Sequence, residues 1–133
     1  MSIEKKILIV DDDPNIRSLL EALLDVSDFE TDSVDSAEQA LSILKIKPFD
    51  IVISDHEMGG MDGSQLAQII KSLYPKIFVI GISGKQTSSS FLSAGADVFL
   101  SKPLNFNELL TIIINHAYRL RRNAVRDLGC IVV

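Results

Sequence analysis

The sequence lacks the features that mark secreted and membrane proteins. It holds a single cysteine, Cys130, so no disulfide can form within the chain, as is usual in a reducing compartment. No hydrophobic run approaches the roughly 18 residues that a membrane-spanning helix needs, and residues 1–6 do not have the hydrophobic segment of a signal peptide. We therefore expect a cytoplasmic protein that does not insert into a membrane.

Positive charge is also scarce. The chain has 13 Lys and Arg residues against 18 Asp and Glu residues, which gives a net charge of −5. Sequence-independent binding of nucleic acid depends on clustered Lys and Arg, so we expect no direct contact with nucleic acid. The basic cluster between Arg119 and Arg126 is typical of a helix C-terminus, where cations are favourable.

Repeats, low-complexity stretches and linkers are missing as well. A length of 133 residues with 47% hydrophobic residues favours one globular domain. We expect this domain to span residues 1–121. The remaining tail, 122–133, is too short to form an output domain such as a DNA-binding module.

Short β-favouring runs alternate with amphipathic stretches along the chain. Strands are predicted near 7–10, 29–34, 50–54, 77–82 and 98–100. Helices are predicted after Pro14 and over 37–44, 66–73, 86–94 and 105–121, the fourth being the weakest because Ser and Thr disfavour helix interiors. This alternation predicts an α/β fold, a doubly wound parallel sheet of five strands with five helices.

Polar residues follow four of the predicted strands. They are Asp11 with Asp12, Asp55, Ser83 and Lys102. The carboxyl ends of parallel strands meet at one edge of a sheet, where ligands bind. Neighbouring carboxylates repel one another unless a cation lies among them, and Mg²⁺ prefers such oxygen ligands. A lysine and a serine hydroxyl add a cation and a donor for a phosphoryl group, with Asp55 as the nucleophile.

Five motifs in order resemble the receiver domain of two-component response regulators. They are Ile-Leu-Ile-Val-Asp-Asp-Asp-Pro (7–14), Asp-Ile-Val-Ile-Ser-Asp (50–55), Gly-Met-Asp-Gly (60–63), Ile-Ser-Gly (82–84) and Gly-Ala-Asp-Val-Phe-Leu-Ser-Lys-Pro (95–103). The resemblance covers residues 5 to about 121 and implies the flavodoxin-like strand order 2-1-3-4-5.

The resemblance also implies a metal site and a phosphoacceptor. Asp55 would accept a phosphoryl group from a sensor histidine kinase or a histidine phosphotransfer protein. Mg²⁺ would bind Asp11, Asp12, Asp55 and the backbone carbonyl of Glu57. Such a domain is a signalling phosphoacceptor and not an enzyme, beyond its own phosphorylation and dephosphorylation.

A switch and a partner surface follow from the same resemblance. Ser83 and Lys102 would contact the phosphoryl group, and Phe99 matches the aromatic switch position. The face made by the fourth helix, the fifth strand and the fifth helix would bind a downstream protein. The run 112–114 makes the last helix hydrophobic on more than one face, which leaves a homodimer as an option beside core burial.

The sequence departs from the family pattern in two places, of which the second bears on the partner mode and the switch more than on the phosphorylation chemistry. Gly59 stands where most receivers have proline, so the loop after Asp55 is expected to be more flexible. The segment between Ser83 and Lys102 is also shorter than the family's, with the loss in the fourth helix.

Two other interpretations stay open. One is a receiver-like interaction module that works without phosphorylation. The other is a haloacid-dehalogenase-like, Mg²⁺-dependent phosphatase, in which Asp11 and Asp13 would form the Asp-x-Asp pair. That family needs a further acidic pair late in the chain, and none follows Lys102 closely, which disfavours the phosphatase.

Overall fold

The sheet holds five parallel strands, as predicted. A computed structural model describes residues 5–84 and 88–127, with side chains described as far as Ala117. The strands are β1 (Lys6–Val10), β2 (Glu30–Val34), β3 (Ile51–Asp55), β4 (Phe78–Ser83) and β5 (Val98–Ser101). Their order, β2-β1-β3-β4-β5, is the one that the family resemblance implied.

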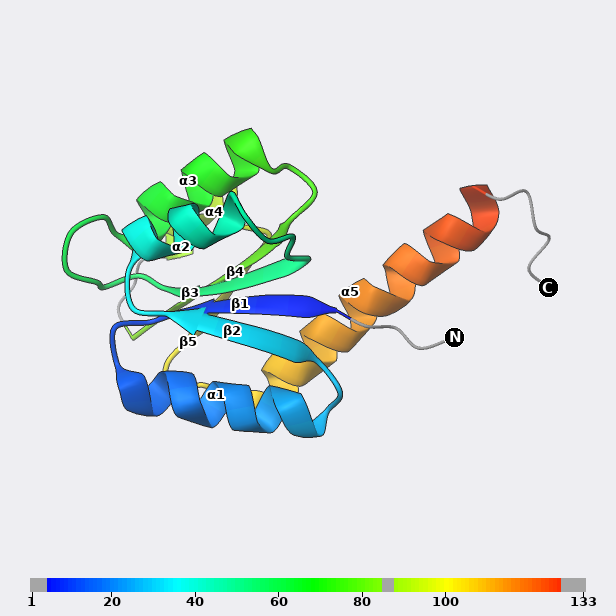
Figure 1. Ribbon diagram of the computed structural model, residues 1–133, viewed down its shortest axis with the longest axis horizontal. Helices are drawn as coiled ribbons and strands as arrows, with labels where there is room; N and C mark the ends of the chain where they lie inside the picture. Colours follow the sequence, from blue (N-terminus) through cyan, green and yellow to red (C-terminus); the bar gives the residue numbers. More distant parts are fainter. Residues whose placement is uncertain (1–4, 85–87, 128–133) are drawn as a thin grey trace. The chain divides into compact units, whose positions relative to one another are not determined.

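The chain divides into two compact units. The first, Glu4–Leu104, contains the whole sheet together with α1 (Pro14–Val26), α2 (Ala37–Leu44), α3 (Gly63–Leu73) and α4 (Ser88–Ser93). In this unit α1 covers one face of the sheet, while α2 and α3 lie on the other (Figure 1). The second unit contains α5 (Phe106–Asp127). No described helix combines the length and the hydrophobicity needed to cross a bilayer.

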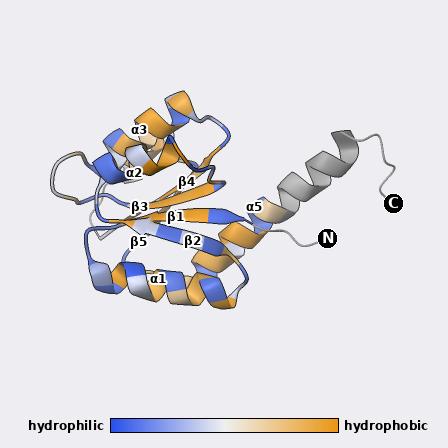
Figure 2. Cartoon of the chain, in the orientation of Figure 1, coloured by the Kyte–Doolittle hydropathy of each residue, from blue (hydrophilic) through white to orange (hydrophobic). Residues whose placement is uncertain are grey.

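Hydrophobic burial explains the positions of the strands in the sheet. Residues 7–10 of β1 and 51–53 of β3 are at most 1% exposed, as expected of strands covered on both faces. β2 has no fully buried residue and lies at the edge. Figure 2 shows the same contrast, with β1 and β3 hydrophobic over much of their length and β2 hydrophilic.

Three of the helices, α1, α2 and α3, begin at residues whose side chains cap them. Asp13 accepts a hydrogen bond from the Asn15 amide, and Ser36 accepts one from the Gln39 amide. Asp62 forms a reciprocal capping box with Gln65 at the start of α3. These bonds satisfy amide groups that a helix leaves without partners, so each helix begins at a defined residue.

The last helix is longer than predicted. We expected it to end near residue 121, but α5 continues to Asp127. No proline or glycine interrupts residues 122–127, so nothing in that stretch stops the helix. The predicted tail therefore begins as helix, and its last residues, 128–133, lie outside the described part of the chain.

α4 is short, but it holds one central core residue. It spans six residues where 86–94 was predicted, and residues 85–87 are outside the described part. Phe91 is 0% exposed and packs against the backbone of Gly81 in β4. A Cβ atom at Gly81 would lie 2.6 Å from the Phe91 ring, so glycine is needed there for steric reasons.

Replacing Gly81 by alanine should therefore destabilise the protein. The added methyl group would overlap the Phe91 ring, 2.6 Å away, and no open space lies beside this buried residue. We expect a loss of about 1–3 kcal/mol in the free energy of unfolding, measured with urea. Gly59→Ala is the matched control, because nothing lies within 4 Å of a Cβ atom at that position. Equal stability of the two variants would contradict a steric role for Gly81.

Candidate functional site

The predicted site residues gather at the carboxyl edge of the sheet. Asp11 follows β1, Asp55 ends β3, Ser83 ends β4 and Lys102 follows β5. These four strands are neighbours, and the Lys102 amide donates to the Ser83 carbonyl at 2.9 Å. The topology thus brings together residues that lie up to 91 positions apart (Asp11 to Lys102).

Three carboxylates form the acidic part of the site. One oxygen each of Asp11, Asp12 and Asp55 lie within 4.8 Å of one another. Asp11 and Asp55 are buried, whereas Asp12 is exposed, so the cluster has an open side. An oxygen-rich site with an open side suits Mg²⁺, which keeps water molecules and binds phosphate oxygens beside one or two carboxylates.

The environment of Asp11 shows the cost of this arrangement. Burial raises the pKa of the Asp11 carboxyl, and the charges of Asp55 and Asp12 raise it further. The hydrogen bond from the Asp13 amide to Asp11 Oδ1 (2.9 Å) and the charge of Lys102 act in the opposite direction without cancelling the increase. A divalent cation would favour the ionised form, so these residues fit a metal site.

Lys102 provides positive charge beside Asp55. Its Nζ lies 3.1 Å from Asp55 Oδ1, and the side chains are 39% and 7% exposed, respectively. Partial burial lowers the pKa of Lys102, but its hydrogen bond to Asp55 and the charges of Asp55, Asp11 and Asp12 raise it above the usual value. Lys102 is therefore a charged partner for an anion bound at Asp55. The peptide bond between Lys102 and Pro103 is cis.

The remaining predicted residues lie around this centre. Ser83 is 1% exposed at the end of the strand beside Asp55, and Glu57 lies exposed in the loop that follows Asp55. Phe99 in β5 is half-buried, and the centroid of its ring lies 5.8 Å from that of Phe91. The ring centroid of Phe91 in turn lies 5.1 Å from that of His56, the residue after Asp55.

Asp13 does not belong to the acidic cluster. Its carboxylate accepts the Asn15 amide at 2.9 Å and so serves as the cap of α1. The phosphatase interpretation needed Asp13 as a partner of Asp11. The observed role of Asp13 therefore disfavours that interpretation.

The loop after Asp55 has an anchor that the sequence did not reveal. Glu38 Oε1 in α2 accepts a hydrogen bond from the Met61 amide at 3.2 Å, next to Gly60, whose φ of 91° favours glycine. At Gly63, a Cβ atom would lie 2.3 Å from the Asp55 carbonyl oxygen. The Gly63 amide donates to the His56 carbonyl at 2.9 Å, so the loop is held at Met61 and at Gly63, while the expected flexibility at Gly59 stays a prediction.

Arg17 is a second contact that sequence reasoning missed. Its Nη1 donates to the backbone carbonyl of Asp11 at 2.6 Å and so links α1 to the end of β1. Nothing in the local pattern distinguishes Arg17 from an ordinary exposed residue on a helix. The contact forms only because α1 packs beside the end of β1, which the sequence around Arg17 does not show.

Comparisons with known proteins agree with the geometry. Residues 7–114 match the model of the response regulator receiver domain family. The chain is 37% identical over 115 residues to the response regulator protein FleR of Pseudomonas aeruginosa, covering 84% of this chain and 24% of FleR. It is 33% identical over 119 residues to the sensor histidine kinase RcsC of Salmonella typhi, covering 87% of this chain and 13% of RcsC. The chain thus spans a quarter or less of the length of these two relatives.

A solved structure is also similar to this chain in fold. The response regulator protein TrrA of Thermotoga maritima, solved in complex with Mg²⁺ and BeF, has a TM-score of 0.78 and 34% identity to this chain. The match covers 84% of this chain and 97% of TrrA.

The acidic cluster should bind Mg²⁺ more weakly as the pH falls. Coordination needs ionised carboxylates, and the pKa of Asp11 is raised, so protons compete for this ligand at a higher pH than for an ordinary aspartate. Calorimetric titrations with MgCl₂ at decreasing pH should show this loss. Asp12→Asn should reduce the affinity by about tenfold or more, whereas Asp25→Asn, an exposed change in α1, should leave it unaltered. Equal affinities in both variants would argue against the cluster as the metal site.

Proposed function

Because the chain belongs to the response regulator receiver family, we propose that it accepts a phosphoryl group on Asp55 from a histidine kinase or a histidine phosphotransfer protein. Receiver domains are signalling modules of two-component systems. The observation that carries the proposal is the position of Asp55, whose carboxylate lies within 4.8 Å of those of Asp11 and Asp12 and 3.1 Å from Lys102 Nζ.

The proposed transfer uses the Asp55 carboxylate as a nucleophile. A carboxylate oxygen attacks the phosphorus atom of a phosphohistidine, forming a P–O bond while the P–N bond breaks. The electron pair of the P–N bond returns to the imidazole, which leaves as histidine after taking up a proton. The attacking group is the Asp55 carboxylate, whose Oδ1 lies 3.1 Å from Lys102 Nζ.

Two side chains of this site would bind the transferred group. Lys102, now paired with Asp55 Oδ1, can pair with a phosphoryl oxygen once that carboxylate has reacted. The Ser83 hydroxyl, at the end of the neighbouring strand, can donate a hydrogen bond to another phosphoryl oxygen. Mg²⁺, held by Asp11, Asp12, Asp55 and the Glu57 carbonyl, would neutralise the negative charge of the carboxylates and of the phosphoryl oxygens.

We propose that phosphorylation of Asp55 changes the position of Phe99 and so alters the surface formed by β5 and α4. A phosphoryl group favours the state in which Ser83 and Lys102 reach it, which shifts the balance between two conformations. The rings of Phe99 and Phe91 meet at a tilt and those of Phe91 and His56 meet edge-on, which forms a packed connection from β5 to the residue after Asp55. Leu92, 51% exposed on α4, offers a hydrophobic contact for a downstream protein on this surface.

Phosphorylation should be detectable on Asp55 alone. Incubation with Mg²⁺ and acetyl phosphate should add one phosphoryl group to the intact mass. The addition should disappear in Asp55→Asn and after chelation of Mg²⁺, and it should persist in Asp25→Asn, because Asp25 lies on the exposed side of α1. Failure of the wild-type protein to form this adduct, and to bind beryllofluoride, would favour a module that works without phosphorylation.

Beryllofluoride, a mimic of the phosphoryl group, should change the surroundings of Phe99. In NMR spectra with Mg²⁺ and beryllofluoride we expect the Phe99 amide signal to shift. The Phe49 signal should stay in place, because Phe49 precedes β3 at the opposite edge of the sheet. Ser83→Ala should reduce the shift, because the hydroxyl is the proposed link between ligand and β5. An unchanged Phe99 signal with bound beryllofluoride would refute the switch but not the phosphoacceptor chemistry.

A further inference from the structure

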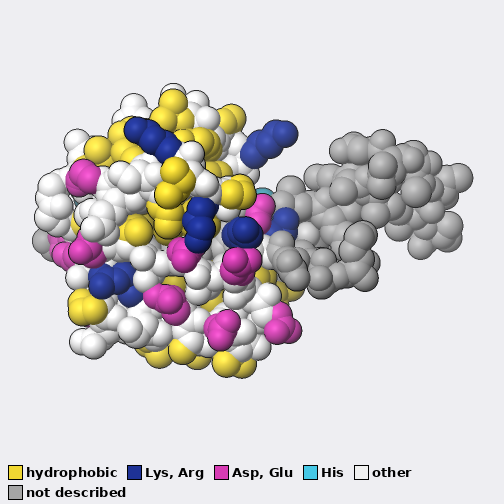
Figure 3. Space-filling view, in the orientation of Figure 1, with side chains coloured by type: hydrophobic (Ala, Val, Ile, Leu, Met, Phe, Trp, Pro, Cys, Tyr) yellow, Lys and Arg dark blue, Asp and Glu magenta, His cyan; other side chains and the backbone are white. Residues whose placement is uncertain are grey.

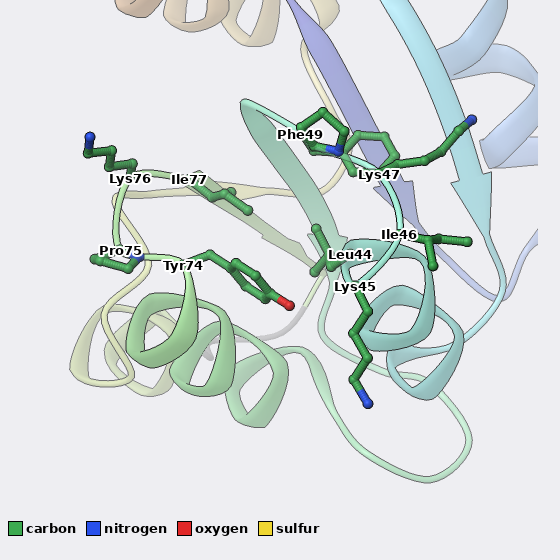
Figure 4. Close-up of a pocket in the computed structure, with 10 residues that line it drawn as sticks. Leu44, Lys45, Ile46, Lys47, Phe49, Tyr74, Pro75, Lys76 and Ile77 are labelled. Carbon is green, nitrogen blue, oxygen red and sulfur yellow. The ribbon is translucent and has the colours of Figure 1, made fainter.

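A hydrophobic groove lies at the amino ends of the strands, whereas Asp55 lies at their carboxyl ends. It opens where α2 ends at Leu44 and α3 ends at Leu73, above the starts of β3 and β4 (Figure 4). Its volume is about 600 Å³, within the usual range of ligand pockets. The residues of the proposed phosphorylation site do not line it, so phosphoryl transfer gives no reason for the groove to exist.

The walls of the groove are hydrophobic. Leu44, Phe49 and Ile77 are each at most 8% exposed and line its floor. The ring of Tyr74 reaches from the end of α3 toward Leu44 and divides the space between the two helix ends (Figure 4). Ile46, 79% exposed, adds a hydrophobic side chain at the margin.

Hydrogen bonds hold one wall of the groove in place. Lys71 Nζ donates to the carbonyl groups of Pro75 (3.2 Å) and Ile77 (2.8 Å) in the loop between α3 and β4. The same ammonium group contacts Asp97 Oδ2 at 3.0 Å, and that oxygen also accepts the Val79 amide at 2.8 Å. Several hydrogen bonds therefore fix the loop before any ligand binds. Because the loop is already ordered, binding costs little conformational entropy there.

The charged residues that line the groove are all basic. The lining residues include Lys45, Lys47 and Lys76 and no acidic residue, although the whole chain carries a net charge of −5. The three lysine side chains point away from the hollow on different sides (Figure 4). Lys47 pairs with Asp32 at 2.9 Å, whereas Lys45 and Lys76 are exposed. In Figure 3, hydrophobic side chains and several basic ones gather over α2 and α3, and most visible acidic side chains lie over α1 and β2.

We propose that this groove is a docking site for an acidic peptide segment of a partner protein. One bulky hydrophobic side chain of the segment would enter between Leu44 and Tyr74, because a buried anchor in a preformed pocket supplies most of the energy of such contacts. Acidic residues on either side of the anchor would pair with Lys45 and Lys76, which favours this class of partner over neutral or basic peptides. The net negative charge of the chain disfavours nucleic acid as the occupant.

The position of the groove predicts that a partner binds there whether or not Asp55 is phosphorylated. The groove lies at the amino ends of β3 and β4, while Asp55 and Ser83 lie at the carboxyl ends of the same strands. A partner in the groove would therefore leave the carboxyl edge accessible. Binding there is expected to be independent of phosphorylation.

A defined peptide tests the proposal with the whole chain. The probe is a fluorescein-labelled peptide, Asp-Glu-Asp-Phe-Asp-Glu, and the measurement is fluorescence polarisation at low salt. We expect micromolar binding that weakens as salt is added. Binding should weaken by about tenfold or more in a Lys45→Glu, Lys76→Glu variant, because each exposed change replaces attraction by repulsion. Lys5→Glu, outside the groove, is the matched control for each of the two substitutions made singly, because it makes the same change of charge as either one.

Further variants test whether the hydrophobic groove itself holds the peptide. A peptide with alanine in place of phenylalanine should bind at least about tenfold more weakly, and Tyr74→Ala should weaken the original peptide. Equal binding of the two peptides, or of a lysine-containing peptide, would overturn the proposal. Self-association of the protein that Lys45→Glu abolishes would also overturn it, in favour of a second copy as the occupant. Affinity should be unchanged with Mg²⁺ and beryllofluoride and in Asp55→Asn, so failure of the phosphoacceptor proposal would leave this test unaffected.

Discussion

The ion pair between Lys102 and Asp55 is the interaction on which the site depends. Asp55 is 7% exposed and ends a strand in the centre of the sheet, among two other aspartates. A carboxylate in such a place is costly unless a positive charge balances it. Lys102, from the end of another strand, supplies that charge. The parallel sheet makes this possible, because it brings the ends of distant chain segments to one edge.

The balance of charge at this edge also explains why the residues fit a metal ion and a phosphoryl group. One lysine beside three carboxylates leaves the cluster negative, and burial, together with the neighbouring carboxylates, raises the pKa of Asp11. A cation among the carboxylates and an anion near Lys102 would each improve the balance. The same geometry therefore favours both ligands together.

Packing behind the site is as specific as the charges in front of it. Phe91 occupies space that only glycine at position 81 leaves open, and it contacts the rings of His56 and Phe99. Dense packing of this kind transmits a displacement instead of absorbing it. The two edges of the sheet differ in character: the carboxyl edge is acidic and holds the chemistry, and the amino edge carries a hydrophobic groove with lysines around it.

The sequence by itself determined the elements and the polar residues that lie at the carboxyl ends of the strands. Hydrophobic runs, capping residues and turn residues are local, so the five strands, the helix starts and the polar residues at the strand ends could be predicted. The strand order needed the family resemblance, since local patterns do not specify which strands are neighbours. The predicted end of α5, near residue 121, was wrong, because nothing in the chain at that position stops a helix.

Only the tertiary structure decided the contacts between distant residues. Glu38 and Met61 are 23 positions apart, and Lys71 and Asp97 are 26 apart, yet each pair forms a hydrogen bond. The steric need for Gly81 arises from Phe91 in another element, and the groove arises where two helices end side by side. No local pattern encodes such contacts, because they depend on how complete elements pack against one another.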